Sequence, residues 1–214
     1  MTTVSIQLLV LAGIAVFLII KLRSVLGTRD GFEPTATTPV ARSMAETVVD
    51  GSLDEDISDH APDGASRSAL AAMKGVEPSF NVTEFLKGAR GAYEMILMAY
   101  DKAEIDRIRP FIGPEVEAGF DASVADRMAR GLTVTSSFMG IRELAMTEAT
   151  FDRASKRAEI SIRFTGEVIR AVKDAEGKVI EGNATAIQRQ REVWAFARTM
   201  GAGDPNWQLV AISD

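Results

Sequence analysis

The residues that could support acid–base, nucleophilic or metal chemistry are few in this sequence, and they cluster in one acidic stretch. The only histidine, His60, lies among Asp56, Asp59 and Asp63. A histidine beside carboxylates suits general base catalysis or metal binding, but one histidine cannot build a His-rich metal site. The chain has no cysteine, which excludes thiol catalysis, disulfides and thiolate metal sites. We therefore interpret His60 as a solvated histidine in a flexible segment.

The acidic run from Asp54 to Asp56 offers oxygen ligands of the kind that Mg²⁺ and Ca²⁺ prefer. It lacks the glycine and the ligand spacing of a calcium loop, so a solvated acidic run is the better interpretation. We predict neither a metal site nor a bound cofactor. Glu159 and Glu167 alternate with apolar residues and so face away from the apolar side of a predicted strand. We therefore expect a binding protein and not an enzyme.

The net charge of −6 is concentrated in one segment. Residues 27–78 hold ten acids and four bases, whereas residues 79–214 hold twenty acids and eighteen bases and are close to neutral. Binding to nucleic acid requires clustered lysines and arginines that neutralise phosphates. The sequence has no such excess, and we predict no nucleic-acid partner.

The first predicted element is an uncharged N-terminal run. Residues 2–20 contain no charged side chain, and basic residues follow directly. As a helix this run would span roughly 28 Å, close to the ~30 Å hydrocarbon core of a bilayer. We therefore predict a transmembrane anchor over residues 1–26. Its apolar and flanking basic positions include Val4, Leu8, Leu11, Phe17, Ile20, Lys21 and Arg23.

Two other interpretations of this run are open, a cleaved signal peptide and a buried core helix. A signal peptide would carry basic residues before the apolar run and a small-residue cleavage site after it. Here Lys21 and Arg23 come after the run, which favours the uncleaved anchor. The positive-inside rule then predicts a single-pass inner-membrane protein with a periplasmic N-terminus and a cytoplasmic C-terminal domain.

Residues 27–78 are predicted to form an acidic flexible linker. Glycines and prolines interrupt the segment repeatedly, and its apolar residues recur with no steady period. Such a segment buries too little apolar area to offset the entropy of ordering the chain. Within it, the stretch from Ser66 to Lys74 is compatible with a transient helix.

Residues 79–214 are predicted to form an ordered domain that begins with helices. Asn81 and Glu84 form a capping box, and Phe80 and Phe85 are placed for a hydrophobic staple. Apolar residues then recur at helical spacing as far as Tyr100. Two further helices are predicted, one over residues 103–109 and one from Pro114 to Gly131 with Val116, Phe120, Val124 and Met128 at four-residue spacing.

After Gly131 the hydrophobic period changes to two, which is typical of strands. Residues 158–168 alternate between apolar and polar side chains, and residues 174–177 (Asp-Ala-Glu-Gly) predict a hairpin turn. A long strand follows as far as Arg198, and residues 207–213 close the sheet. Helices followed by antiparallel strands predict an α+β domain with helices packed on a curved antiparallel sheet.

Several stretches of the sequence together resemble one family. They are Leu22-Arg23-Ser24-Val25-Leu26-Gly27, Phe85-Leu86-Lys87-Gly88-Ala89-Arg90-Gly91-Ala92-Tyr93-Glu94, Ala158-Glu159-Ile160, Glu181-Gly182, Val193-Trp194-Ala195-Phe196-Ala197-Arg198 and Asp204-Pro205-Asn206-Trp207. In this combination the chain resembles the bacterial TimA family, relatives of the 44-kDa subunit of the mitochondrial inner-membrane translocase, with its Tim44-like domain. The resemblance covers the anchor and residues 79–214, and Arg191-Glu192 and Asn183 depart from it.

The resemblance implies a cone-shaped domain of the nuclear transport factor 2-like type with an apolar pocket. It also implies a scaffold that touches the inner membrane. The side chains expected to meet the membrane or a partner are Phe85, Lys87, Arg90 and Tyr93, with anionic phospholipid as a further partner. In the alternative, Phe85 and Tyr93 pack into the core of the domain and the two basic side chains are merely solvated.

The candidate pocket residues are Ile160, Ile162, Phe164, Trp194, Phe196 and Trp207. Filling the core between the sheet and the helices is the competing role for these large apolar side chains. We predict a non-catalytic, membrane-anchored adaptor that associates with an inner-membrane protein complex. The alternative is a domain that binds lipid or another hydrophobic ligand at the membrane surface.

Overall fold

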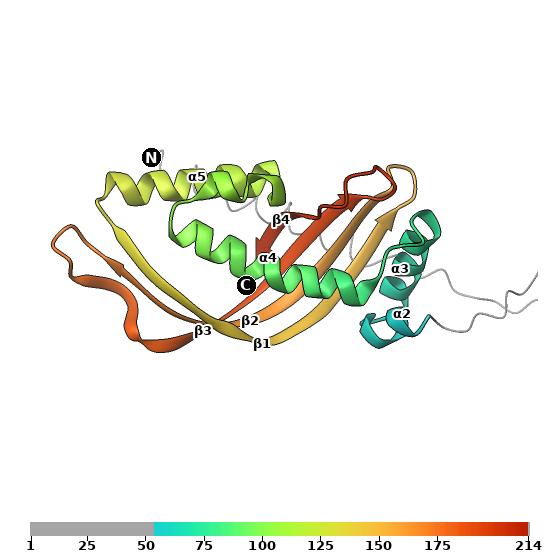
Figure 1. The fold of residues 1–214 in the computed structure, drawn as a ribbon, viewed down its shortest axis with the longest axis horizontal. Helices are drawn as coiled ribbons and strands as arrows, with labels where there is room; N and C mark the ends of the chain where they lie inside the picture. The colour runs from blue at the N-terminus through green and yellow to red at the C-terminus, as the bar shows by residue number, and fades with distance from the viewer. Residues whose placement is uncertain (1–53, 214) are drawn as a thin grey trace, which may run out of the picture. The chain divides into compact units, whose positions relative to one another are not determined.

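The computed structural model describes residues 54–213 (Figure 1). The predicted anchor and the linker as far as residue 53 lie outside the described residues. Within residues 54–213, no helix is both long and apolar enough to cross a bilayer.

The described residues form helices first and strands afterwards. The helical elements are α2 (Glu55–His60), α3 (Gly64–Val76), α4 (Val82–Asp101), the 3₁₀ turns η1 (Ile105–Arg107) and η2 (Arg109–Phe111), and α5 (Pro114–Ala129). The strands are β1 (Thr133–Asp152), β2 (Arg157–Lys173), β3 (Val179–Thr199) and β4 (Gln208–Ser213). This order confirms the predicted α+β class.

The four strands form one antiparallel sheet in the order β1-β2-β3-β4. β1 and β4 are its two edges, so the sheet stays open and does not close into a barrel. Figure 1 shows the three long strands bent into a trough, with α4 and α5 on its concave side. The prediction of helices on a curved antiparallel sheet is therefore confirmed, and the arrangement is an open trough.

The predicted flexible linker is wrong for the part that the structure describes, because α2 and α3 are packed parts of the domain. Leu70 and Met73 on α3 are fully buried, and Ile57 on α2 is 4% exposed. The hydroxyl of Ser66 accepts a hydrogen bond of 3.1 Å from the backbone N–H of Ala149 on the edge strand β1. A few apolar side chains at helical spacing are enough to pack one face of α3 into the core. The helix-breaking residues Pro62, Gly64 and Pro78 lie at or beyond the ends of the helix and do not interrupt it.

The acidic run is also more than a solvated surface, because Asp56 caps the start of α4. Its carboxylate accepts hydrogen bonds from the backbone N–H groups of Val82 (2.7 Å) and Thr83 (2.9 Å) and from the Thr83 hydroxyl (2.8 Å). Lys74 lies 3.2 Å from the same carboxylate. Burial alone would raise the pKa of Asp56, but these hydrogen bonds outweigh it and lower the pKa to about 2. His60 Nε2 lies 3.0 Å from the Thr83 hydroxyl, so the histidine also belongs to this helix junction.

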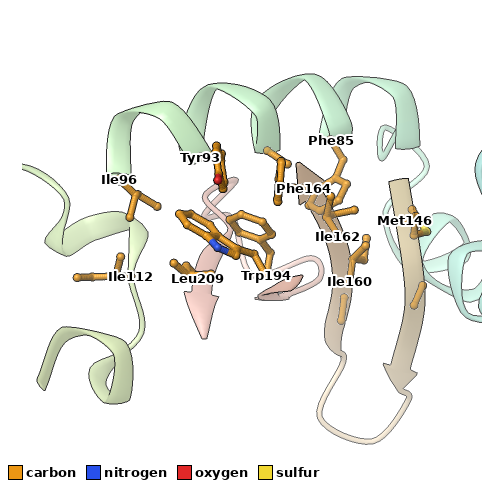
Figure 2. Close-up of a cluster of buried hydrophobic side chains, with 14 of the residues drawn as sticks. Phe85, Tyr93, Ile96, Ile112, Met146, Ile160, Ile162, Phe164, Trp194 and Leu209 are labelled. Carbon is orange, nitrogen blue, oxygen red and sulfur yellow. The ribbon is translucent and has the colours of Figure 1, made fainter. Parts of the chain in front are cut away.

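The predicted cap of α4 is confirmed, since the Asn81 side chain accepts a hydrogen bond from the Glu84 N–H at 2.8 Å. Further along the helix, Tyr93 is fully buried at the centre of the core (Figure 2). Its ring stacks on Phe164, with the centroids 4.5 Å apart. Gly166 on β2 makes this contact possible, because a Cβ atom there would lie 2.6 Å from the Tyr93 hydroxyl.

The helices after α4 differ from their predicted form. The stretch predicted as a short helix over residues 103–109 forms the 3₁₀ turns η1 and η2, after Ala103 with φ of 60°. α5 begins at Pro114 as predicted, but Met128 in the predicted apolar stripe is 66% exposed. Of that stripe Val124 is buried. The four-residue spacing therefore predicts the helix, but it does not show how much of the apolar face of that helix packs against the rest of the domain.

The central strand β2 follows the predicted alternation, with Ile160, Ile162, Phe164 and Val168 fully buried. Glu159 and the other polar residues between them face the opposite side of the sheet. The predicted hairpin turn is also confirmed, since Gly177 N–H bonds to the Asp174 carbonyl at 3.0 Å. The bounds of β1 were not predicted from the sequence, and its register against β2 is shifted at three places.

Candidate functional site

An apolar hollow lies between the first half of α4 and the loop that leads into β4. It has a volume of about 510 Å³ and is open to solvent on one side. We call it the Trp207 groove; its apolar lining includes Phe80, Phe85, Met95, Phe111, Phe196 and Trp207. Phe80 and Phe85, the predicted staple pair, both pack on Trp207, with ring centroids 5.9 and 4.7 Å away. The indole ring is therefore held from two sides.

An ion pair forms part of the lining of the groove. Arg198 Nη2 lies 2.9 Å from Glu77 Oε1, and the guanidinium lies 5.3 Å from the centre of the Trp207 ring. Burial alone would raise the pKa of Glu77, but hydrogen bonds from the Gly201 N–H and from Arg198 hold it below its usual range. A charged pair of this kind orients Trp207 by cation–π attraction and adds polar groups to the lining of the groove.

Part of the side of the groove formed by α4 consists of small residues, between the larger side chains of Phe85 and Met95. Gly88, Gly91 and Ala92 line it, and a Cβ atom added at either glycine would have nothing within 4 Å. The sequence predicts these three residues as a small-residue patch of the helix that another backbone could approach closely. Small side chains let another backbone approach a helix closely, as at tightly packed helix pairs. The groove can therefore hold an apolar segment against α4 with little steric hindrance.

A family model decides the relationship of the chain to known proteins. The model of the Tim44-like domain matches residues 66–214, which is more than half of the chain. The chain therefore belongs to the Tim44-like family. The match begins inside α3, which agrees with the packed position of that helix and places the start of the Tim44-like domain before the predicted boundary at residue 79.

No curated relative matches the chain. Among solved structures, the intermembrane space region of the chloroplast protein ARC6 is similar with 12% sequence identity and a TM-score of 0.37. The similarity covers 58% of this chain and 94% of that chain. It is too distant to add to the family assignment.

The candidate pocket residues divide into two groups in the Tim44-like domain. Ile160, Ile162 and Phe164 are fully buried under α4 and fill the core (Figure 2). Trp194 is 2% exposed and packs on Tyr93, with the ring centroids 4.7 Å apart. The other two, Phe196 and Trp207, line the groove.

The residues predicted to contact a membrane or a partner also fall into two groups, one buried and one exposed. Phe85 is 7% exposed and Tyr93 is fully buried, which corresponds to the alternative in which these two side chains pack into the core. Lys87 and Arg90 are exposed, and Lys87 lies 3.6 Å from Glu84 on the same helix. Contact of these two basic side chains with anionic lipid stays a prediction.

Most residues of the groove were not identified as site residues in the sequence, among them Glu77, Met95, Phe111 and Arg198. Glu77 falls in the stretch predicted as a linker, and Phe111 lies in a 3₁₀ turn that has no hydrophobic period. Arg198 belongs to a stretch that resembles the family, but its partner Glu77 lies 121 positions away in sequence. No local pattern could have paired them.

Among residues 54–213, no three Asp, Glu or His side chains lie close enough together to hold a metal ion. Burial and the neighbouring Glu192 carboxylate raise the pKa of Tyr93 above its usual range, so this phenol stays protonated and donates to Glu192 at 3.4 Å. The groove can bind an apolar group beside the polar Arg198–Glu77 pair.

Proposed function

We propose that this protein is a membrane-anchored, cytoplasmic adaptor whose Trp207 groove binds an apolar segment of an inner-membrane protein complex. The observation that carries the proposal is an open apolar groove lined on one side by bare helix backbone at Gly88 and Gly91. Membership of the Tim44-like family supports it, since the resemblance implies a scaffold at a membrane.

The shape of the groove favours a peptide segment as its occupant. A helix or an extended chain can lie against the glycine backbone of α4 and place an apolar side chain on Trp207. The Arg198–Glu77 pair in the lining of the groove offers hydrogen bonds to the polar groups of a main chain. Aromatic anchors in a desolvated pocket commonly supply most of the binding energy of such contacts.

A lipid or another hydrophobic ligand is the second candidate for the groove. Its volume of about 510 Å³ lies within the range of small-molecule pockets, roughly 300–1,000 Å³. Lys87 and Arg90 are exposed on α4, the helix that lines the groove, and would attract anionic headgroups. This reading favours a domain that contacts its own membrane directly.

Filling the groove is the sharpest test, because it leaves the fold intact. Gly91→Leu places a side chain in open space within α4, and replacing a helical glycine favours the helix by about 1 kcal/mol. Gly119→Leu is the matched control, since Gly119 is also helical and open but lies on α5, away from the groove. The tagged full-length protein and both variants are extracted in mild detergent, and the co-purifying proteins and lipids are measured by mass spectrometry.

The adaptor function predicts a defined set of membrane proteins that is retained with Gly119→Leu and lost with Gly91→Leu. If a lipid in fixed ratio is what Gly91→Leu loses, and no protein changes, then the hydrophobic-ligand function replaces the adaptor function. A variant with Lys87 and Arg90 both changed to Glu separates the lipid headgroup contribution from the groove. If neither protein nor lipid depends on Gly91, the groove is not the binding site.

A further inference from the structure

The start of β1 is an open stretch of the sheet edge. β1 is an edge strand, and from Thr133 to Phe138 it pairs with β2 without a register shift. We call this stretch the Thr133 edge; its sequence, Thr-Val-Thr-Ser-Ser-Phe, contains no charged residue and no proline. The outward backbone groups of an edge strand have no partner within the sheet, so they can pair with another strand.

The rest of β1 is protected against such pairing. Three register shifts follow Phe138, and the charged residues Arg142 and Glu143 lie among them. Further along, the hydroxyl of Ser66 on α3 accepts the hydrogen bond of the Ala149 backbone N–H. Bulges, charges and a covering helix are the usual means by which proteins block an exposed sheet edge.

The opposite side of the sheet is protected as well. The Gly113 N–H donates to the Leu209 carbonyl of β4 at 2.7 Å and so occupies part of that edge. Where β3 extends beyond β4, it leaves its register between Asn183 and Gln188 and then carries the charged Arg189. Among residues 54–213, the Thr133 edge is therefore the stretch of sheet edge that lacks this protection.

A hollow beside α4 leaves space over the Thr133 edge. Ser136, Ser137 and Phe138 line it together with residues of α4 and η1, and its volume is about 650 Å³. Its charged lining residues are two acids and two bases: Glu94, Glu104, Lys102 and Arg107. Two such surfaces can therefore approach each other without a net repulsion between like charges.

We propose that the Thr133 edge pairs antiparallel with the same edge of a second copy of this chain, about a two-fold axis at Ser136. In this register Val134 of one copy lies opposite Phe138 of the other, and Thr135 lies opposite Ser137. Aromatic–β-branched pairs and Thr–Ser pairs stabilise neighbouring strands, and no like charges face each other. The two four-stranded sheets then form one continuous sheet in a closed, symmetric dimer.

A single cysteine can report this contact, because the chain has none of its own. Ser136→Cys places two thiols opposite each other on the axis, with Cβ atoms about 4.5–5.5 Å apart. Ser213→Cys is the control, since Ser213 ends β4 at the opposite edge of the sheet. Both full-length variants are purified in mild detergent and oxidised with copper phenanthroline. The disulfide-linked dimer should form at least about 10-fold faster with Ser136→Cys, because a disulfide requires close Cβ atoms.

A charge on the edge should weaken the dimer. Thr135→Lys brings two like charges to the diagonal spacing of about 7–8 Å across the new strand pair. Thr150→Lys is the matched control, because Thr150 is also exposed on β1 but lies beyond the register shifts. Sedimentation of the full-length protein in density-matched detergent measures the dissociation constant. Thr135→Lys should raise it about 5-fold, Thr150→Lys should leave it unchanged, and the two variants should melt at the same temperature.

Three results would overturn the proposal. Equal oxidation rates at Ser136 and Ser213 would show that the thiols meet by random collision. Equal dissociation constants for Thr135→Lys and Thr150→Lys would show that the copies associate through another surface, such as the predicted anchor. A monomer at every concentration would exclude a second copy and leave the edge to an extended segment of another protein. None of these results bears on the Trp207 groove, because no residue of the Thr133 edge lines it.

Discussion

Asp56 gives the clearest quantitative prediction, because one carboxylate caps α4 from outside that helix. In the folded protein its pKa is about 2, against an ordinary value of 3.8. That difference corresponds to about 2 kcal/mol of folding free energy when the carboxyl is ionised. The magnitude agrees with a charged group that satisfies two free N–H donors in the first turn of a helix.

The sign of the pH dependence follows from the lowered pKa. The folded state binds the proton less tightly than the unfolded state, so the contribution of Asp56 is fully present above about pH 4. It is lost as the pH falls from about 4 to about 2. Asp56→Asn should therefore lower the free energy of unfolding by about 2 kcal/mol at pH 7, and the difference from the parent should shrink towards pH 2.

Urea denaturation of the full-length protein, followed by circular dichroism at several pH values between 2 and 7, measures this difference. Asp59→Asn is the control, since Asp59 lies on the same helix, α2, and is exposed. It should change the free energy of unfolding by less than about 0.5 kcal/mol at every pH. A difference between Asp56→Asn and the parent that stays constant down to pH 2 would refute the cap as the cause.

Two further substitutions test the packing that positions the sites. Gly166→Ala places a Cβ atom 2.6 Å from the Tyr93 hydroxyl, and it should lower the free energy of unfolding by about 1–3 kcal/mol in urea denaturation. An unchanged free energy of unfolding would mean that Tyr93 moves freely at β2. Leu70→Ala opens a cavity under α3 and should cost about 2–5 kcal/mol in the same assay, whereas a change below about 0.5 kcal/mol would show that α3 is not part of the folded domain.

Local periodicity predicted most of the regular elements. The alternation along β2, the Asn81 cap and the start of α5 at Pro114 all depend on neighbours within a few residues. Such patterns are visible in one sequence because the period of the backbone sets them. The order of helices and strands, and hence the α+β class, followed from the same patterns.

What the sequence could not show depends on partners far apart in the chain. The burial of Leu70 and Met73 requires the sheet that follows them, and without that sheet the composition of α3 and its flanks is typical of a linker. The groove depends on Glu77 with Arg198, and the end of α4 is held on the sheet by Asp101 with Arg170, 69 positions later. These pairs form only when the fold brings the helical part of the chain and the later strands together.

One helix positions the groove on the sheet, which gives the Asp56 cap a role beyond stability. The N-terminal half of α4 supplies Phe85, Gly88 and Gly91 to the groove, and its last residue, Asp101, lies 3.0 Å from Arg170 on β2. Tyr93 fixes the middle of the helix on the sheet through Phe164 and the bare backbone at Gly166. The first turn, in contrast, is held by the Asn81 side chain and by the Asp56 carboxylate from α2. Since a helix frays from its ends, Asp56 keeps the groove half of α4 in place without lining the groove.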